Sequence, residues 1–218
     1  MNAQQSTPSL SIHRVDSSSD PNFAPLSRIY AESFPEAERK SVAKLSQMIE
    51  RSAYQFLTAS QQDSVVGYSI AARLQDCDAC LLEYLSVDRE HRGQGIGQFL
   101  FAKTAESRPV ADRILLIEVE SDKNESAEKA IRTRRKSFYR KLGCREIPFL
   151  KYLMPQVSTG TLPPMDWMVY HPSLPQSIEK ARVRHWLESC YEQVYNVSAG
   201  DPRIEFMLDA LPDNLQLI

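Results

Sequence analysis

Residues 82–97 read LEYLSVDREHRGQGIG, and this stretch carries more structural information than any other part of the chain. Its first six residues are mainly apolar and typical of a buried strand, whereas helical spacing begins near Ile96. Three of the seven glycines fall in the connection, at Gly93, Gly95 and Gly97. Glycine lets the backbone N–H groups at a helix N-terminus approach an anion closely. The stretch therefore predicts a strand–loop–helix unit that can bind a phosphate or pyrophosphate.

A glycine-rich turn also occurs in ordinary tight connections between a strand and a helix, so both interpretations stay open at this point. Two familiar phosphate-binding motifs are excluded. The dinucleotide pattern G-x-G-x-x-G, started at Gly93, would need a glycine where the chain has Gln98. The P-loop pattern is also absent, because no glycine is followed by Lys and then Ser or Thr.

A second motif supports a more specific interpretation. Residues 138–144 read FYRKLGC, at the expected end of a helix, with Gly143 where a helix C-terminus favours glycine. With the glycine loop, this segment resembles the GNAT acyltransferase superfamily over about residues 10–155. Arg92, Gly95 and Gly97 match the family's pattern [RQ]-x-x-G-x-[GA], and 138–144 is similar to its F-Y-x-x-x-G-F segment.

Two positions depart from the family pattern. Cys144 replaces the usual phenylalanine, and Arg132 stands where the family often has an asparagine that contacts the pantetheine arm.

The resemblance implies an α/β (α+β) fold, with a mixed, mostly antiparallel twisted sheet of about seven strands flanked by helices. It also implies acetyl-CoA as cosubstrate and transfer of its acetyl group to a primary amine. By this resemblance the coenzyme-binding residues are Leu85, Ser86, Val87, Arg92, Gly93, Gln94, Gly95, Ile96 and Gly97. A backbone N–H near Val87 would polarise the thioester carbonyl.

The catalytic residues expected from the resemblance are Tyr139 as general acid and Glu83 or Glu118 as base. The two glutamates lie in neighbouring expected strands, and water is the alternative proton acceptor. Each glutamate could equally occupy a structural salt bridge, and Tyr139 a buried packing position. A non-catalytic acyl-CoA-binding sensor or interaction module on the same fold is the competing function.

Hydrophobic patterning gives the expected elements. Strands are expected at about 10–15, 54–59, 64–72, 80–87, 114–119, 144–154 and 165–170. Helices are expected at about 21–34, 42–49, 96–106, 127–142 and 174–197, with turn-rich sequence at 157–164. In the fourth helix, Ala127, Ile131, Phe138 and Leu142 are expected to face the core. The expected domains are an acetyltransferase domain over 1–172 and a C-terminal helical extension over 173–218.

Composition and charge restrict which other functions are possible. The 218 residues include 26 basic and 28 acidic side chains, a net charge of −2 that argues against a globally basic nucleic-acid-binding protein. Cys77 and Cys80 form a C-x-x-C without a second pair at zinc-site spacing, so no metal is expected. The first ten residues lack a signal-peptide pattern, and no apolar run approaches the roughly 18 residues of a membrane span.

From these observations we expect a cytoplasmic enzyme with no nucleic-acid or membrane partner. The acceptor could be a small-molecule amine or an amine of a protein or peptide, and a homodimer stays open.

Overall fold

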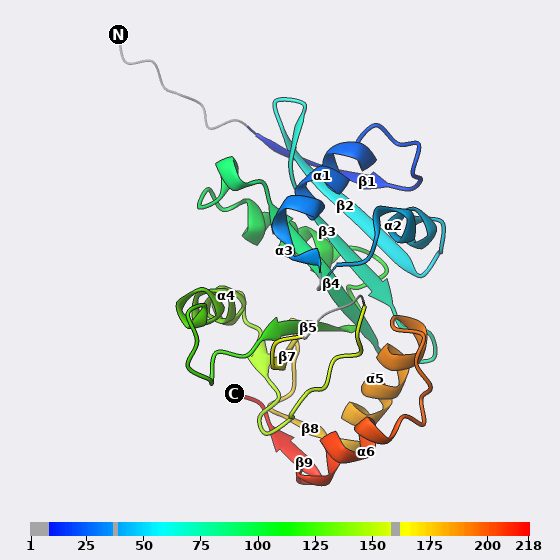
Figure 1. Ribbon diagram of the computed structural model, residues 1–218, viewed down its shortest axis with the longest axis vertical. Coiled ribbons are helices and arrows are strands. Elements are labelled where there is room, and N and C mark those ends of the chain that lie inside the picture. Colours follow the sequence, from blue (N-terminus) through cyan, green and yellow to red (C-terminus); the bar gives the residue numbers. More distant parts are fainter. Residues whose placement is uncertain (1–8, 37–38, 158–161) are drawn as a thin grey trace.

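The computed structural model describes residues 9–36, 39–157 and 162–218, and strands and helices alternate along it largely as expected (Figure 1). The strands are β1 Leu10–Val15, β2 Tyr54–Gln61, β3 Ser64–Arg73, β4 Ala79–Val87, β5 Ile114–Glu120, β6 Arg145–Glu146, β7 Met165–Tyr170, β8 Ser177–Glu179 and β9 Asn214–Gln216. The α-helices are α1 Phe23–Ser33, α2 Val42–Ile49, α3 Ile96–Glu106, α4 Lys129–Lys141, α5 Lys180–Gln193 and α6 Pro202–Asp209, and a 3₁₀ turn, η2, spans Arg89–His91.

Seven of the strands form one sheet in the order β1-β2-β3-β4-β5-β7-β6. Its β4–β5 pair is parallel, and the other neighbouring strands run antiparallel. The prediction of a mixed, mostly antiparallel sheet of about seven strands is therefore confirmed. Strands β8 and β9 form a separate antiparallel pair.

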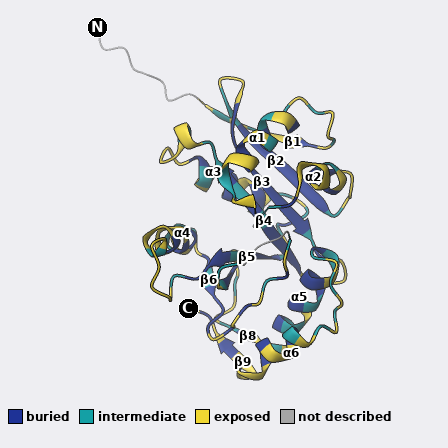
Figure 2. Cartoon of the chain, viewed as in Figure 1, coloured by how far each residue is buried: buried dark blue, intermediate teal, exposed yellow. Residues whose placement is uncertain are grey.

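Helices cover both faces of the large sheet. Side chains of α1, α2, α5 and α6 share one hydrophobic cluster with one face, whereas α3 and α4 pack against the other. The central strands are almost wholly buried between these layers, and exposed residues gather on the outer sides of the helices and in the loops (Figure 2). None of the helices in the described part of the chain is long and apolar enough to cross a membrane.

The C-terminal segment packs into the main core. Val183, Trp186, Leu187 and Cys190 of α5 are each 0% exposed and belong to the cluster that lies on the central strands. The Trp186 indole donates a hydrogen bond of 2.7 Å to Asp78, in the turn before β4. Backbone hydrogen bonds in both directions join Ile218 to Glu146. We propose that residues 173–218 are an extension that folds together with the domain of residues 1–172.

The predicted core face of α4 is wrong at Ile131, which is 61% exposed. The buried residues of this helix are Arg132, Lys136 and Tyr139. The physical reason is an ion-pair network, because the Lys136 ammonium lies 2.8–3.0 Å from three carboxylates. These carboxylates belong to Asp122, Glu146 and Asp166. A charged side chain with that many partners is stable in the interior, and its position turns the apolar Ile131 outward.

Two further boundaries differ from expectation. The strand expected over 144–154 is reduced to β6, because Pro148 cannot donate to a ladder and Phe149 adopts a φ of 65°. The helix expected over 174–197 is shorter, because β8 precedes it and pairs with β9. The turn-rich segment expected at 157–164 lies partly outside the described residues.

Replacing the buried Trp186 with alanine tests whether the C-terminal extension belongs to the folding unit. Truncation of a large buried aromatic costs about 3–5 kcal/mol, so the free energy of unfolding in urea should fall by that order. Phe206→Ala on α6 is the matched control, because this ring is 60% exposed and its loss should have little effect. Equal stability of Trp186→Ala and the native protein would contradict the proposal.

Candidate active site

Strands β4 and β5 stay together for a short distance and then separate. Their parallel register covers four pairs, the last of which is Leu82 with Ile117. Ile70 of β3 pairs with Tyr84, whereas the next residue of β3 pairs with Leu82. Glu83 is thus the extra residue of a β-bulge, and bulges re-aim side chains and end local pairing. Glu83 and Glu118 are the first residues beyond the last pair.

The two glutamates predicted as alternative bases come together in the structure. Both line a small cavity of about 70 Å³ on the sheet face that carries α1 and α5. Phe34, Met154 and Tyr195 contribute to the same cavity. This cavity, hereafter the glutamate cleft, lies where β4 and β5 diverge.

Glu83 is held by a buried ion pair. One carboxylate oxygen contacts the Lys40 ammonium, and the two side chains are 3% and 8% exposed respectively. The other carboxylate oxygen, Oε1, is buried and has no hydrogen-bond partner among the described residues. An unpartnered buried carboxylate oxygen carries a desolvation cost, so it is a natural acceptor for an N–H group of a ligand.

The Glu118 carboxylate forms hydrogen bonds with hydroxyl groups, whereas Glu83 pairs with a cation. Tyr152 and Tyr195 each donate a hydrogen bond to one of its carboxylate oxygens. Burial raises the pKa of Glu118, and the nearby charge of Glu83 raises it further, while the two tyrosine hydroxyls act in the opposite direction. The raised pKa makes this carboxylate a better proton acceptor than an exposed glutamate.

Sequence reasoning missed Lys40, Tyr152 and Tyr195. They come from the segment before α2, the segment after β6 and the end of α5, so no sequence spacing connects them to the glutamates. From the sequence, Tyr195 could be recognised only as a residue on the apolar face of a helix.

The predicted coenzyme loop forms the connection from β4 to α3. Gly93 and Gly95 have φ values of 80° and 82°, which β-carbon-bearing residues rarely adopt. Gly95 is the N-cap of α3 and provides no side-chain cap, so the first N–H groups of the helix lack that partner. A β-carbon at Gly93 or Gly95 would meet nothing within 4 Å. An open space in front of an uncapped helix N-terminus fits a pyrophosphate group.

The other predicted coenzyme residues lie beside this loop. Arg92 donates a hydrogen bond of 3.1 Å to the carbonyl of Val87, which fixes the path of the chain after β4. Leu85, Ser86 and Val87 pair with β3 on one side, while the β4–β5 pairing has already ended on the other. Beyond Leu82, the edge of β4 that faces β5 therefore has no β-strand partner among the described residues, although the Val87 carbonyl accepts the bond from Arg92. In α3, Ile96 is buried, and a β-carbon at Gly97 would lie 3.4 Å from the Phe138 ring.

Tyr139 lies on the opposite face of the sheet from the glutamate cleft. It belongs to an apolar cluster with Phe101 and Ile117, and burial raises the pKa of its hydroxyl. Its ring contacts those of Phe101 and Phe138 edge to face, at centroid distances of 6.0 and 5.1 Å. Lys136 anchors α4 one turn earlier through the ion pairs described above. The structure thus brings Glu83 and Glu118 together and places Tyr139 on the other side of β5.

Comparison with known proteins finds a family model that matches the central part of the chain. The model of the acetyltransferase (GNAT) domain matches residues 52–146, which run from just before β2 to the end of β6. None of the curated proteins resembles the sequence closely enough to count as a match.

Solved structures share the fold. A protein described as a GNAT-family acetyltransferase from Bacteroides thetaiotaomicron has a TM-score of 0.70 and 19% identity, over 86% of this chain and 99% of that one. An aminoglycoside 6'-N-acetyltransferase complexed with coenzyme A has a TM-score of 0.53 and 18% identity, over 73% and 96%. The Escherichia coli ribosomal-protein-S18-alanine N-acetyltransferase has a TM-score of 0.52 and 17% identity, over 77% and 99%.

The family match covers the strand, the glycine loop and the helix that sequence analysis singled out, and the shared fold extends over most of the chain. Residues 52–146 therefore match the acetyltransferase (GNAT) domain family, and the chain shares the fold of known GNAT acetyltransferases over most of its length.

Proposed function

We propose that the protein transfers an acetyl group from acetyl-CoA to a primary amine by direct attack of the amine on the thioester. The observation that carries this proposal is the layout of β4. This one strand presents the Glu83 carboxylate, then a free backbone edge at residues 85–87, and then leads into the glycine loop. Acceptor, thioester and pyrophosphate sites thus follow one another along 15 residues of chain, 83–97.

Acetyl-CoA supplies the activated acetyl group when bound. Residues 92–97 bind its pyrophosphate through backbone N–H groups at the positive end of α3. The free edge at Leu85, Ser86 and Val87 binds the pantetheine arm through backbone hydrogen bonds. The N–H of Val87 polarises the carbonyl that is attacked.

Of the two candidate bases, Glu83 has the stronger support. An attacking amine must lose a proton, and Oε1 of Glu83, which lacks a hydrogen bond among the described residues and lies near the Tyr54 hydroxyl, can accept an N–H hydrogen bond. Both oxygens of Glu118 already accept hydrogen bonds from tyrosines, so one hydroxyl would have to move first. The raised pKa of Glu118 supports it as the second assignment, with a proton route through Tyr152 or Tyr195.

Tyr139 is assigned as the general acid that protonates the departing thiolate. Burial raises the pKa of its hydroxyl, so the group stays protonated throughout the working range, as a proton donor must. Tyr139 and the glutamates lie on opposite faces of β5, so a thioester bound beside β4 would have the base on one face of the sheet and the acid on the other.

The acceptor is a small-molecule amine or an amine of a protein or peptide. The solved structures with a similar fold include one enzyme named for each kind of acceptor, an aminoglycoside acetyltransferase and a ribosomal-protein acetyltransferase. The alternative of a non-catalytic acyl-CoA-binding module would need only the glycine loop and the free edge. The two buried carboxylates next to that edge favour the enzyme.

Gly95→Glu tests the coenzyme site. The new side chain adds bulk and a negative charge where the pyrophosphate is assigned, so calorimetry should detect no acetyl-CoA binding by a variant that still melts cooperatively. Gly95→Asn is the control, because asparagine tolerates a positive φ and adds no charge, and it should bind acetyl-CoA weakly but measurably. Native affinity in folded Gly95→Glu would refute the phosphate-loop assignment.

Tyr139→Phe tests the acid by removing one hydroxyl. Acetyl-CoA affinity should stay the same while kcat falls by about 10²–10⁴-fold, the usual contribution of general acid catalysis. Tyr170→Phe is the matched control, because this ring packs on the same Phe101, at a centroid distance of 5.1 Å. The control should keep its activity. Full turnover by Tyr139→Phe would discard the assignment.

Glu83→Gln and Glu118→Gln distinguish the two bases. The variant that lacks the true base should lose activity most at pH 6, where the amine is largely protonated, and recover partly towards pH 9. We expect this profile, with a loss of about 10²–10⁴-fold in kcat/KM, for Glu83→Gln and a smaller loss for Glu118→Gln. If both variants kept full activity, solvent water would be the proton acceptor and neither assignment would hold.

A further inference from the structure

A second and much larger cavity lies beside the glutamate cleft. Its volume of about 930 Å³ is in the range typical of small-molecule sites. It is bordered by the segment between α1 and α2, the ends of β2 and β3, and the end of α5. Two residues connect it to the glutamates. Tyr195 lines both spaces and donates to Glu118, and Lys40 lines the larger cavity and pairs with Glu83.

The lining of this cavity is strongly cationic, although the whole chain carries a net charge of −2. Its charged residues are Arg39, Lys40, Lys44, Arg51 and Arg73 against Glu36 and Glu192. Apart from Lys40, these cations form no ion pair with a carboxylate of the described residues. Positive charge gathered in a concave site concentrates the field and attracts anions.

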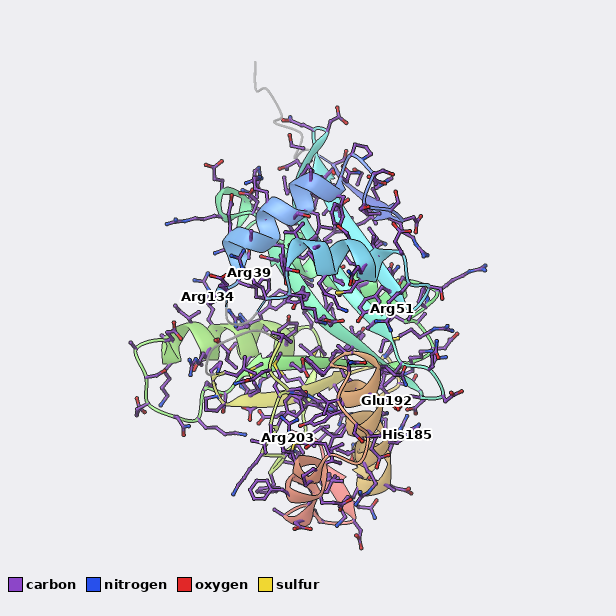
Figure 3. The ribbon with its side chains drawn as sticks, turned by 45° about the vertical axis from the view of Figure 1, so that its right-hand side comes forward. Arg39, Arg51, Arg134, His185, Glu192 and Arg203 are labelled. Carbon is purple, nitrogen blue, oxygen red and sulfur yellow. The ribbon has the colours of Figure 1, made fainter. Side chains whose placement is uncertain are left out.

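Two of the arginines are positioned by neutral groups. The Arg39 guanidinium donates to the carbonyl of Ala31 at 3.1 Å, and that of Arg51 donates to the carbonyl of Gln193 at 3.4 Å. The Arg51 guanidinium also lies over the Tyr54 ring, 5.1 Å from its centroid. Figure 3 shows Arg51 above α5 and its Glu192, whereas Arg39 lies on the other side of the view, near Arg134. A guanidinium has five N–H donors, so these contacts leave others available for an anion.

We infer that the acceptor is a small primary amine that also carries a carboxylate or phosphate group. This inference rests on the proposed function. The anionic group binds to the arginines of the large cavity, and the amine reaches past Tyr195 to the glutamates. An acceptor with several ammonium groups is disfavoured, because its further charges would face the arginines. A protein surface is also disfavoured by the volume, which suits a small molecule.

Calorimetry with paired probes tests the inference without any turnover. β-Alanine and propylamine form one pair, which tests recognition of a carboxylate. O-Phosphoethanolamine and ethanolamine form the other, which tests recognition of a phosphate. One or both anionic probes should bind, and which one binds identifies the anion. Propylamine and ethanolamine, which lack the anionic group, should bind at least about 10-fold more weakly, since charge-assisted hydrogen bonds are lost.

The double variant Arg51→Gln with Arg73→Gln should weaken binding of the anionic probe by at least about 10-fold and raise its KM similarly. Its affinity for acetyl-CoA should not change. Arg108→Gln is the control, because Arg108 is exposed, lies outside this cavity and forms no ion pair among the described residues. Control and native protein should be indistinguishable.

The outcomes separate this inference from the proposed function. Arginine-dependent binding of an anionic probe without acetyl transfer would leave the cavity assignment standing and refute the enzyme. Acetyl transfer to polycationic amines or to amines without an anionic group, unaffected by the double variant, would overturn the cavity assignment alone. Failure of both probes that carry an anionic group to bind, or equal binding of the two members of each pair, would also overturn it.

Discussion

The separation of β4 and β5 after a single short run of pairs is the constraint on which the rest of the site depends. Parallel strands that stayed paired would leave no free edge and no space between them. The pairing with β5 ends where β4 also has a bulge, since Glu83 is an extra residue in the ladder with β3. From that point the two strands present carboxylates, a free backbone edge and, beyond it, the glycine loop.

The divergence of the strands has an electrostatic consequence, since two glutamates line one small cavity there. The structure stabilises them by different means. Lys40 provides Glu83 with a full opposite charge, whereas Glu118 has two tyrosine hydroxyls and a raised pKa. Removing one partner of a buried ion pair typically costs about 3–5 kcal/mol, so the Lys40–Glu83 pair also fixes the segment before α2 over the cleft. Two carboxylates in different surroundings can then take different chemical roles.

Local sequence predicted most of the sheet and the strand–loop–helix unit that is proposed to bind the coenzyme. The strand of residues 82–87, the glycines after it and the helix from Ile96 lie within 25 consecutive residues, and each has its own pattern. The features that local sequence did not predict have one cause, which is contact between residues far apart in the sequence. Lys136 is buried and Ile131 exposed because three carboxylates from other segments surround the ammonium. Likewise Ile178 and Leu215 pair across β8 and β9, a contact that two three-residue strands cannot signal in sequence.

The same distinction explains why the acceptor could not be read from sequence. The GNAT model covers residues 52–146, which include both glutamates, the coenzyme loop and Tyr139. Most of the charged lining of the large cavity lies outside that range. Arg39, Lys44 and Arg51 come from before it, and Glu192 comes from α5, after it. The extension also supplies Tyr195, which contacts Glu118 and lines both cavities. The residues proposed for catalysis thus lie in the part of the chain that the family model covers, while most of the proposed acceptor-binding residues lie in segments outside it.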